Sequence, residues 1–166
     1  MRKGELLPWV GLAVRLTAAG IWLFAGITKL ADLDGFRAQV AAYQVLPHAL
    51  VSPFSYGLPL VEVAIGAYLL VGAMVRPTAI LACVLMVVFL VAEAQAWARG
   101  LSIDCGCFGT TVQTQVGAAT ILRDIALGVP SLLMAWRPAR KLSVDASLLG
   151  REDAFAPGRA AGIEPA

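Results

Sequence analysis

Charged and metal-binding side chains are scarce in this sequence, and their scarcity excludes several classes of protein. Only 14% of the 166 residues are charged, whereas about 25% is usual in a soluble domain. The single histidine, His48, argues against a His-rich metal site and against a Ser-His-Asp hydrolase. The net charge of +2 and the lack of a basic stripe or a glycine-rich phosphate loop give no support for a nucleic-acid partner.

Apolar residues are abundant instead, at 59% of the chain with a mean hydropathy of +0.78. A chain of this length cannot hide so much apolar surface in one small core, so we expect the lipid bilayer to be its solvent. Four apolar runs are long enough to cross: 8–31, 54–75, 77–99 and 116–136. The sequence predicts an all-α integral membrane four-helix bundle over residues 1–137 and a disordered cytoplasmic tail over 138–166.

Lysine and arginine positions predict the orientation of these spans, because cytoplasmic ends carry the excess of basic residues. One side of the membrane collects Arg2, Lys3, Arg76, Arg137, Arg140 and Lys141. The other side collects Lys29, Arg37 and Arg99. We therefore predict a multi-pass protein of the inner or plasma membrane with both termini in the cytoplasm.

The loop between the first two spans carries a short amphipathic pattern after Asp34, a candidate N-cap. Apolar residues recur there at helical spacing, and a proline ends the segment: Phe36, Val40, Tyr43 and Pro47. We expect a short extracytoplasmic helix with its apolar face toward the membrane. It is either a lid over the bundle or a docking or gating surface beside the second outer loop.

That second outer loop contains the hexapeptide DCGCFG at residues 104–109, with two thiols one glycine apart. Two thiols this close form a redox pair, a local staple or half of a soft-metal site. We expect a disulfide across Gly106 to be strained and therefore exchangeable. A staple would normally join distant segments, and the loop has no third cysteine, methionine or histidine for a metal. Redox exchange is thus the favoured interpretation of Cys105 and Cys107, and no metal is expected.

The residues after the hexapeptide predict where the fourth helix begins. The sequence TTVQ at 110–113 fits a capping box, so we expect the helix to start just beyond Gly109. Its positive end would favour a thiolate nearby, while Asp104 would oppose one on Cys105. The two thiols should therefore be unequal, although the sequence does not say which one attacks. Cys83, about 24 Å along the third helix from its outer end, is too deep to reach them.

Ionisable residues inside membrane spans are costly and usually functional. Five fall in the outer half of the predicted spans, beneath the cysteine loop: Lys29, Glu62, Glu93, Arg123 and Asp124. Opposite charges at one depth can pair. The cluster is either structural glue between helices or a site that tunes the thiols or binds an electron carrier such as a quinone. A quinone suits the chemistry, because thiol oxidation releases protons and quinone reduction consumes them.

The chain resembles the MauE/DoxX group of small four-helix membrane proteins. The resemblance rests above all on the hexapeptide, which is typical of the MauE branch, and on GITKL at 26–30, Phe36, Tyr43, Leu46-Pro47, Glu62, Gly66 and LLVG at 69–72. It implies a four-helix bundle in the inner membrane and a role in handling disulfides of exported proteins, as in maturation of the disulfide-rich small subunit of methylamine dehydrogenase. It also implies a thioredoxin-like partner, and the DoxX branch is linked to thiosulfate:quinone oxidoreductase.

Together the residues and the resemblance lead us to expect a membrane thiol–disulfide oxidoreductase or electron conduit. Cys105 and Cys107 would exchange with an extracytoplasmic thioredoxin-like or exported protein. Two alternatives remain open at this point. In the first, the chain is a non-catalytic structural subunit of a membrane redox complex. In the second, it is a soft-metal carrier.

Overall fold

The computed structural model describes residues 3–109, 111 and 114–137, and this part of the chain forms five helices and no strand. They are α1 (Lys3–Ala31), α2 (Leu33–Ala42), α3 (His48–Val71), α4 (Val75–Ala98) and α5 (Ala118–Trp136). All but α2 are long and apolar enough to span a membrane. The predicted all-α, four-span architecture with a short helix after the first span is confirmed, and the protein is a multi-pass membrane protein. The tail predicted over 138–166 lies outside the described residues.

The outward-facing side chains of the long helices suit lipid rather than water. Leu60, Val91 and Leu122 are 60%, 62% and 71% exposed, and many other large apolar side chains lie on the surface with them. Soluble monomers rarely expose apolar patches of this extent. The buried residues of each span therefore mark only the side that faces the other helices.

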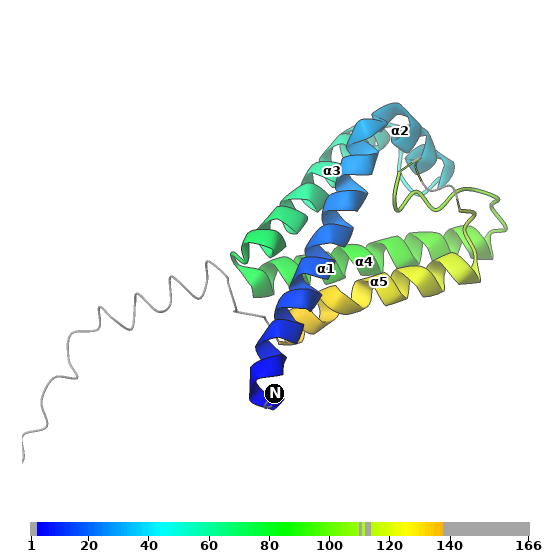
Figure 1. Cartoon of the computed structure of the whole chain (residues 1–166). Coiled ribbons are helices and arrows are strands. Elements are labelled where there is room, and N and C mark those ends of the chain that lie inside the picture. Colours follow the sequence, from blue (N-terminus) through cyan, green and yellow to red (C-terminus); the bar gives the residue numbers. More distant parts are fainter. Residues whose placement is uncertain (1–2, 110, 112–113, 138–166) are drawn as a thin grey trace, which may run out of the picture.

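The long helices pack mainly as two pairs, α1 with α3 and α4 with α5. As Figure 1 shows, α3 and α4 are joined at one end and diverge toward the end where α2 and the cysteine loop lie. The joining turn follows Gly72, which closes α3 in the left-handed conformation at φ 75° and donates its N–H to Tyr68 O. The second and third spans are thus joined directly by a short turn. We call the opposite, diverging end of the bundle the loop end.

Small residues let α1 and α3 approach closely. A Cβ placed on Gly26 would lie 2.8 Å from Pro59 O, and one placed on Gly66 would lie 2.8 Å from Leu23 N. Close backbone approach through glycine is a common way to join helices in membranes, where no hydrophobic force drives them together. These two glycines therefore fix the spacing of the α1–α3 pair, which positions Lys29 of α1 beside Glu62 of α3.

Three predicted boundaries differ from the structure. The second span begins at His48 instead of residue 54, and Pro47 precedes this helix rather than ending the amphipathic one. The N-cap of α2 is Asp32, whose Oδ1 accepts a hydrogen bond from Gly35 N, and not Asp34. Hydropathy marks where the chain becomes apolar, whereas backbone capping decides where a helix begins, so the two need not coincide.

The fourth helix was also predicted to start too early, just beyond Gly109, although the predicted fourth span, 116–136, nearly coincides with the helix. α5 begins at Ala118, and its first turn is closed by Thr120 Oγ1, which accepts the Gly117 N–H at 2.9 Å. The predicted capping box at 110–113 is wrong as the start of this helix, and three of its four residues lie outside the described part of the chain. The cysteine loop is consequently longer than expected.

Candidate functional site

Cys105 and Cys107 are joined in a disulfide, with their Cα atoms 5.5 Å apart. Gly106 between them has φ +73°, a conformation that residues with a Cβ rarely adopt, so the tight bend depends on glycine. The loop then doubles back on itself. Cys105 N–H donates to Thr114 O at 2.9 Å, and Val116 N–H donates to Ile103 O at 2.9 Å. These bonds hold the sulfur pair at the loop end of the bundle.

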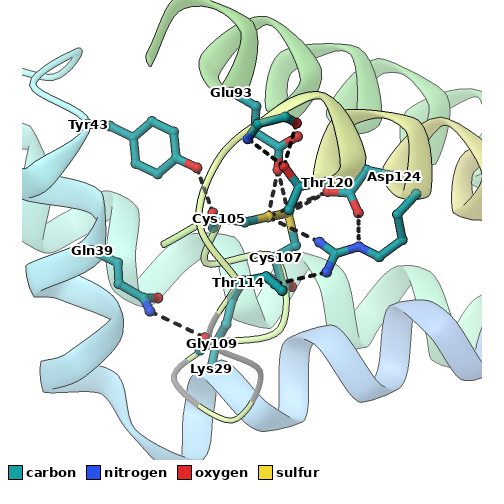
Figure 2. The surroundings of a disulfide bond; sticks show 12 residues. Lys29, Gln39, Tyr43, Glu93, Cys105, Cys107, Gly109, Thr114, Thr120 and Asp124 are labelled. Atoms are coloured by element: carbon teal, nitrogen blue, oxygen red, sulfur yellow. Dashed lines mark hydrogen bonds and ion pairs between the residues drawn. A yellow bond between two sulfur atoms is a disulfide. The ribbon is translucent and has the colours of Figure 1, made fainter. Parts of the chain in front are cut away.

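Two carboxylates from different helices lie against the sulfurs (Figure 2). Glu93 of α4 places Oε1 2.6 Å from Cys105 Sγ and 3.0 Å from Cys107 Sγ. Asp124 of α5 places Oδ2 2.8 Å from Cys107 Sγ and 3.6 Å from Cys105 Sγ. Both carboxylates are almost fully buried. In the dithiol form each sulfur therefore has a carboxylate acceptor within hydrogen-bond distance for its proton.

Arg123 of α5 makes the two sulfurs unequal. Its Nη2 lies 3.3 Å from Cys105 Sγ, while its Nε donates to Asp124 Oδ1 at 2.7 Å and its Nη1 donates to Thr114 Oγ1 at 3.1 Å. The guanidinium contacts Cys105 and not Cys107. A positive charge at this distance stabilises a thiolate on Cys105. The inequality predicted from the helix end and Asp104 thus has a more direct source in Arg123.

Lys29 and Glu62 form a second, separate charge pair beneath the loop. Lys29 Nζ lies 2.8 and 2.9 Å from the two Glu62 oxygens, and both side chains are at most 2% exposed. Nζ also donates to Cys107 O at 2.6 Å. The pair therefore joins α1 to α3 and anchors the backbone of the cysteine loop to both helices.

The short helix α2 holds the loop from the other side. Tyr43 Oη donates to Cys105 O at 2.6 Å, and Gln39 Nε2 donates to Gly109 O at 3.3 Å. Burial, followed by the nearby Glu93 charge, raises the pKa of the Tyr43 phenol well above its usual value, so the hydroxyl remains a donor. α2 and its C-cap residue Tyr43 therefore hold the backbone of the cysteine loop in place through these two hydrogen bonds.

The structure brings all five predicted charged residues to the region under the loop, but in two groups with different contacts. Glu93, Arg123 and Asp124 touch the sulfurs, whereas Lys29 contacts the loop backbone at Cys107 O and pairs with Glu62. Cys83 is a free cysteine, partly buried within α4. Sequence reasoning missed Gln39 and Thr114. Gln39 could have been found from its spacing, because it lies on the same face of α2 as Phe36 and Tyr43.

The arrangement can support two kinds of chemistry. Thiol–disulfide exchange needs a sulfur that a partner can reach, a stabilised leaving thiolate and groups that take up protons. Here Cys107 is partly exposed, Arg123 contacts Cys105, and two carboxylates contact the sulfurs. Metal binding needs converging donors, and ligand atoms of Glu93, Cys105, Cys107 and Asp124 all lie within 4.8 Å of one another. The carboxylates thus supply the donors that the loop sequence itself lacks.

Fold and site together define a class: a four-span helical membrane protein with a paired cysteine loop seated on buried carboxylates. Within that class the chain belongs to the family described as methylamine utilisation protein MauE, whose family model matches residues 7–137. The resemblance to MauE predicted from the hexapeptide and the spans is therefore confirmed; its extension to the DoxX branch stays a prediction.

Individual relatives show the same relationship. The chain is 33% identical to methylamine utilization protein MauE of Paracoccus denitrificans over 77% of its own length and 69% of the relative's. It is 30% identical to the MauE protein of Paracoccus versutus, covering 79% and 74% of the two chains. It is 33% identical to that of Methylorubrum extorquens, covering 78% and 70%. No solved structure matches the chain.

Proposed function

We propose that this protein is a membrane thiol–disulfide exchange protein in which the Cys105–Cys107 disulfide accepts electrons from a dithiol of a partner protein. The observation that carries the proposal is the placement of both sulfurs against Glu93 and Asp124, with a guanidinium on Cys105 alone. A disulfide that served only as a staple would need neither proton acceptors nor a cation at one of its sulfurs.

Exposure and charge together indicate the order of events. Cys105 is only 6% exposed, whereas Cys107 is partly exposed. The partner's thiolate attacks Cys107 Sγ, the S–S bond breaks, and Cys105 leaves as a thiolate beside Arg123. The partner's second thiol then attacks its own sulfur in the mixed disulfide and releases Cys107. Two electrons and two protons have then passed from the partner to the pair, with Glu93 and Asp124 within reach of both sulfurs.

Trapping with single-cysteine variants tests this order. In a Cys83→Ala background, the lone Cys107 thiolate of Cys105→Ser attacks the disulfide of the oxidised partner, which is the proposed first exchange run in reverse. One partner thiol is released, and the mixed disulfide that forms has no Cys105 to displace the partner. We expect Cys105→Ser to accumulate mixed disulfides in cell membranes, visible on non-reducing gels, and Cys107→Ser to accumulate few. Equal trapping by both variants would contradict the assignment of Cys107, and trapping by neither would contradict thiol exchange itself.

The proposal also covers the kind of partner protein and the side of the membrane on which the cysteine loop lies. We propose that the cysteine loop faces the extracytoplasmic side and that the partner is a thioredoxin-like or exported protein there. The relatives are named for methylamine utilization, and we propose the same process as the setting for this chain. A membrane-impermeant alkylating agent applied to whole cells should label the reduced pair; labelling only after lysis would place the loop on the cytoplasmic side.

A soft-metal carrier is the second candidate, favoured by the four converging ligand atoms. Thiolates suit thiophilic ions, and the dithiol form would offer two of them beside two carboxylates. Mass spectrometry of metal content in the purified, reduced protein separates the candidates. One ion per chain in the wild type, absent from a Cys105→Ser/Cys107→Ser double variant, would support the carrier; metal-free wild type with intact thiol exchange would exclude it.

A non-catalytic structural subunit makes a different prediction. If the disulfide only stabilised the loop, the double serine variant would unfold more easily and leave oxidation of the partner unchanged. Under the proposed function the same variant abolishes partner oxidation. Measuring both quantities on one preparation distinguishes the two.

A further inference from the structure

An apolar cavity of about 160 Å³ lies at the loop end of the bundle, against the disulfide. Its walls come from α2, the segment after it, α3, α4 and the cysteine loop itself, with Lys29 of α1. The side chains that line it are almost all hydrophobic, among them Phe36, Leu58 and Phe89. Cys105 and Cys107 form part of the same wall, as do Lys29 and Glu93. The cavity therefore combines an apolar interior with one redox-active wall.

Three residues that line the cavity are exposed: Val45 after α2, Phe54 of α3 and Val88 of α4, at 54%, 36% and 48%. Leu58, one turn further along α3 from Phe54, is buried. Two of the three lie on the facing sides of α3 and α4, so the cavity has an opening between these helices. Exposed lining residues mark where a cavity meets its surroundings. Both helices are membrane spans that separate toward this end (Figure 1), so the surroundings of this opening are lipid. A ligand would enter from the bilayer.

The size and lining of the cavity restrict what can occupy it. An apolar cavity of roughly 150 Å³ stays free of water and holds one six-membered aromatic ring. A planar ring carried on a lipid-soluble tail fits both the volume and the lateral opening. The sulfurs on the wall add a chemical requirement, because a dithiol formed there needs an acceptor of two electrons and two protons.

We propose that this cavity binds the ring of a membrane-soluble quinone, which re-oxidises the reduced Cys105–Cys107 pair. The inference rests on the proposed function, because thiol exchange with a partner is what would reduce the pair. Cys105 and Cys107 together give up two electrons and two protons as their S–S bond forms, and the quinone is converted to the quinol. No other oxidant is required.

Glu93 is the residue placed to carry the protons. Its side chain lines the cavity, and its Oε1 lies within 3.0 Å of both sulfurs. Its Oε2 is buried and has no hydrogen-bond partner among the described residues. Of the five charged residues expected at a quinone site, Lys29 and Glu93 line this cavity; Arg123, Asp124 and Glu62 do not. The remaining surface is apolar, as a ring requires.

Substitutions on two neighbouring positions of α4 test the assignment. Ala92 lines the cavity, whereas Val91 is 62% exposed and does not, so Ala92→Trp fills the space and Val91→Trp adds the same side chain facing lipid. The full chain is placed in lipid nanodiscs, reduced with dithiothreitol, freed of reductant and mixed without oxygen with ubiquinone-1, whose fully substituted ring disfavours direct addition of thiols. Quinone absorbance and alkylation of the remaining thiols are followed together.

We expect the wild type and Val91→Trp to consume one quinone per pair and to lose the thiols of Cys105 and Cys107, with the Cys83 thiol unchanged. Ala92→Trp should react at least about tenfold more slowly, which corresponds to a loss of about 1.4 kcal/mol. Ala92→Leu, which adds less volume, should fall between them. A photoreactive azidoquinone should label peptides that contain Phe54 or Val88 in the wild type and not in Ala92→Trp.

Equal rates for Ala92→Trp and the wild type, or no oxidation of the wild-type pair, would overturn the quinone site; either result would leave the cavity to a phospholipid acyl chain. A slow Ala92→Trp supports the inference only if that variant still exchanges its disulfide with dithiothreitol at the wild-type rate, since this shows an intact loop. The mixed-disulfide experiment is independent. A pair that exchanges with partner thiols but not with quinone leaves the proposed function standing and removes this inference alone.

Discussion

Removing the ammonium of Lys29 should destabilise the fold more than removing it together with its partner. Lys29→Met keeps a similar side-chain length but leaves the Glu62 carboxylate, 1% exposed, without its counter-charge. It also removes the donor to Cys107 O. The structure therefore predicts two distinct losses, one at the ion pair and one at the loop backbone.

The magnitudes of these losses can be separated. Breaking one side of a buried ion pair costs about 3–5 kcal/mol, because an uncompensated charge remains. Replacing both partners by apolar residues is often neutral, so Lys29→Met/Glu62→Leu should lose only the bond to Cys107 O. An unsatisfied buried acceptor costs about 1–3 kcal/mol. We expect the double variant to be about 2 kcal/mol more stable than Glu62→Leu, and about 4 kcal/mol more stable than Lys29→Met, which shares its loss of the bond to Cys107 O.

Unfolding in mixed detergent micelles provides the measurement. Increasing fractions of dodecyl sulfate unfold the helices, and tryptophan fluorescence reports the transition through Trp22, which is 2% exposed, whereas Trp9, Trp97 and Trp136 are more than half exposed in the folded protein. Glu62→Leu alone completes the double-mutant cycle. A double variant that is less stable than both single variants would refute the assignment of Lys29–Glu62 as a coupled ion pair and would mean that each residue acts through other contacts.

Two further predictions follow from the contacts of the loop and of the helix pair. Arg123→Gln should slow reduction of the disulfide by dithiothreitol about 10- to 100-fold, because a hydrogen bond to a charged group contributes about 1.5–3 kcal/mol. Arg123→Lys keeps the positive charge and should retain much of the rate. Stopped-flow kinetics that show no change for Arg123→Gln would contradict a role of Arg123 at Cys105. Gly66→Val should destabilise the α1–α3 pair, since the added Cβ would lie 2.8 Å from Leu23 N, whereas Gly20→Ala, with nothing within 4 Å, serves as the control in the same unfolding assay.

Much of the fold was accessible from the sequence. Span number and approximate position follow from hydropathy, which is a local property of the chain, and the first predicted span, 8–31, agrees with Pro8–Ala31. The start of the second span was missed by six residues. The fourth span, 116–136, was close to the helix Ala118–Trp136, but the helix itself was expected to start at TTVQ, which has the composition of a capping box without being the start of this helix.

The candidate site was predicted in part. The cysteine pair was evident because both thiols lie within three consecutive residues, and the five charges were conspicuous because ionisable residues are rare in apolar spans. Their pairing was not evident. Arg123 pairs with its sequence neighbour Asp124, but its contact with Cys105 depends on how the loop folds back. Lys29 of α1 pairs with Glu62 of α3, and only the packing of those two helices brings them together.

By itself the sequence determined that the chain is a membrane protein, how many times it spans the bilayer, and that two thiols lie close together in one short loop. These properties depend on short stretches of chain and on the cost of placing polar groups in lipid. Only the tertiary structure decided that Glu93 and Asp124 lie against the sulfurs, that Lys29 reaches Cys107 across 78 positions of sequence, and that α3 and α4 leave an apolar cavity beside the disulfide. Such contacts join distant segments, and they depend on how whole helices approach and diverge, which no local pattern encodes.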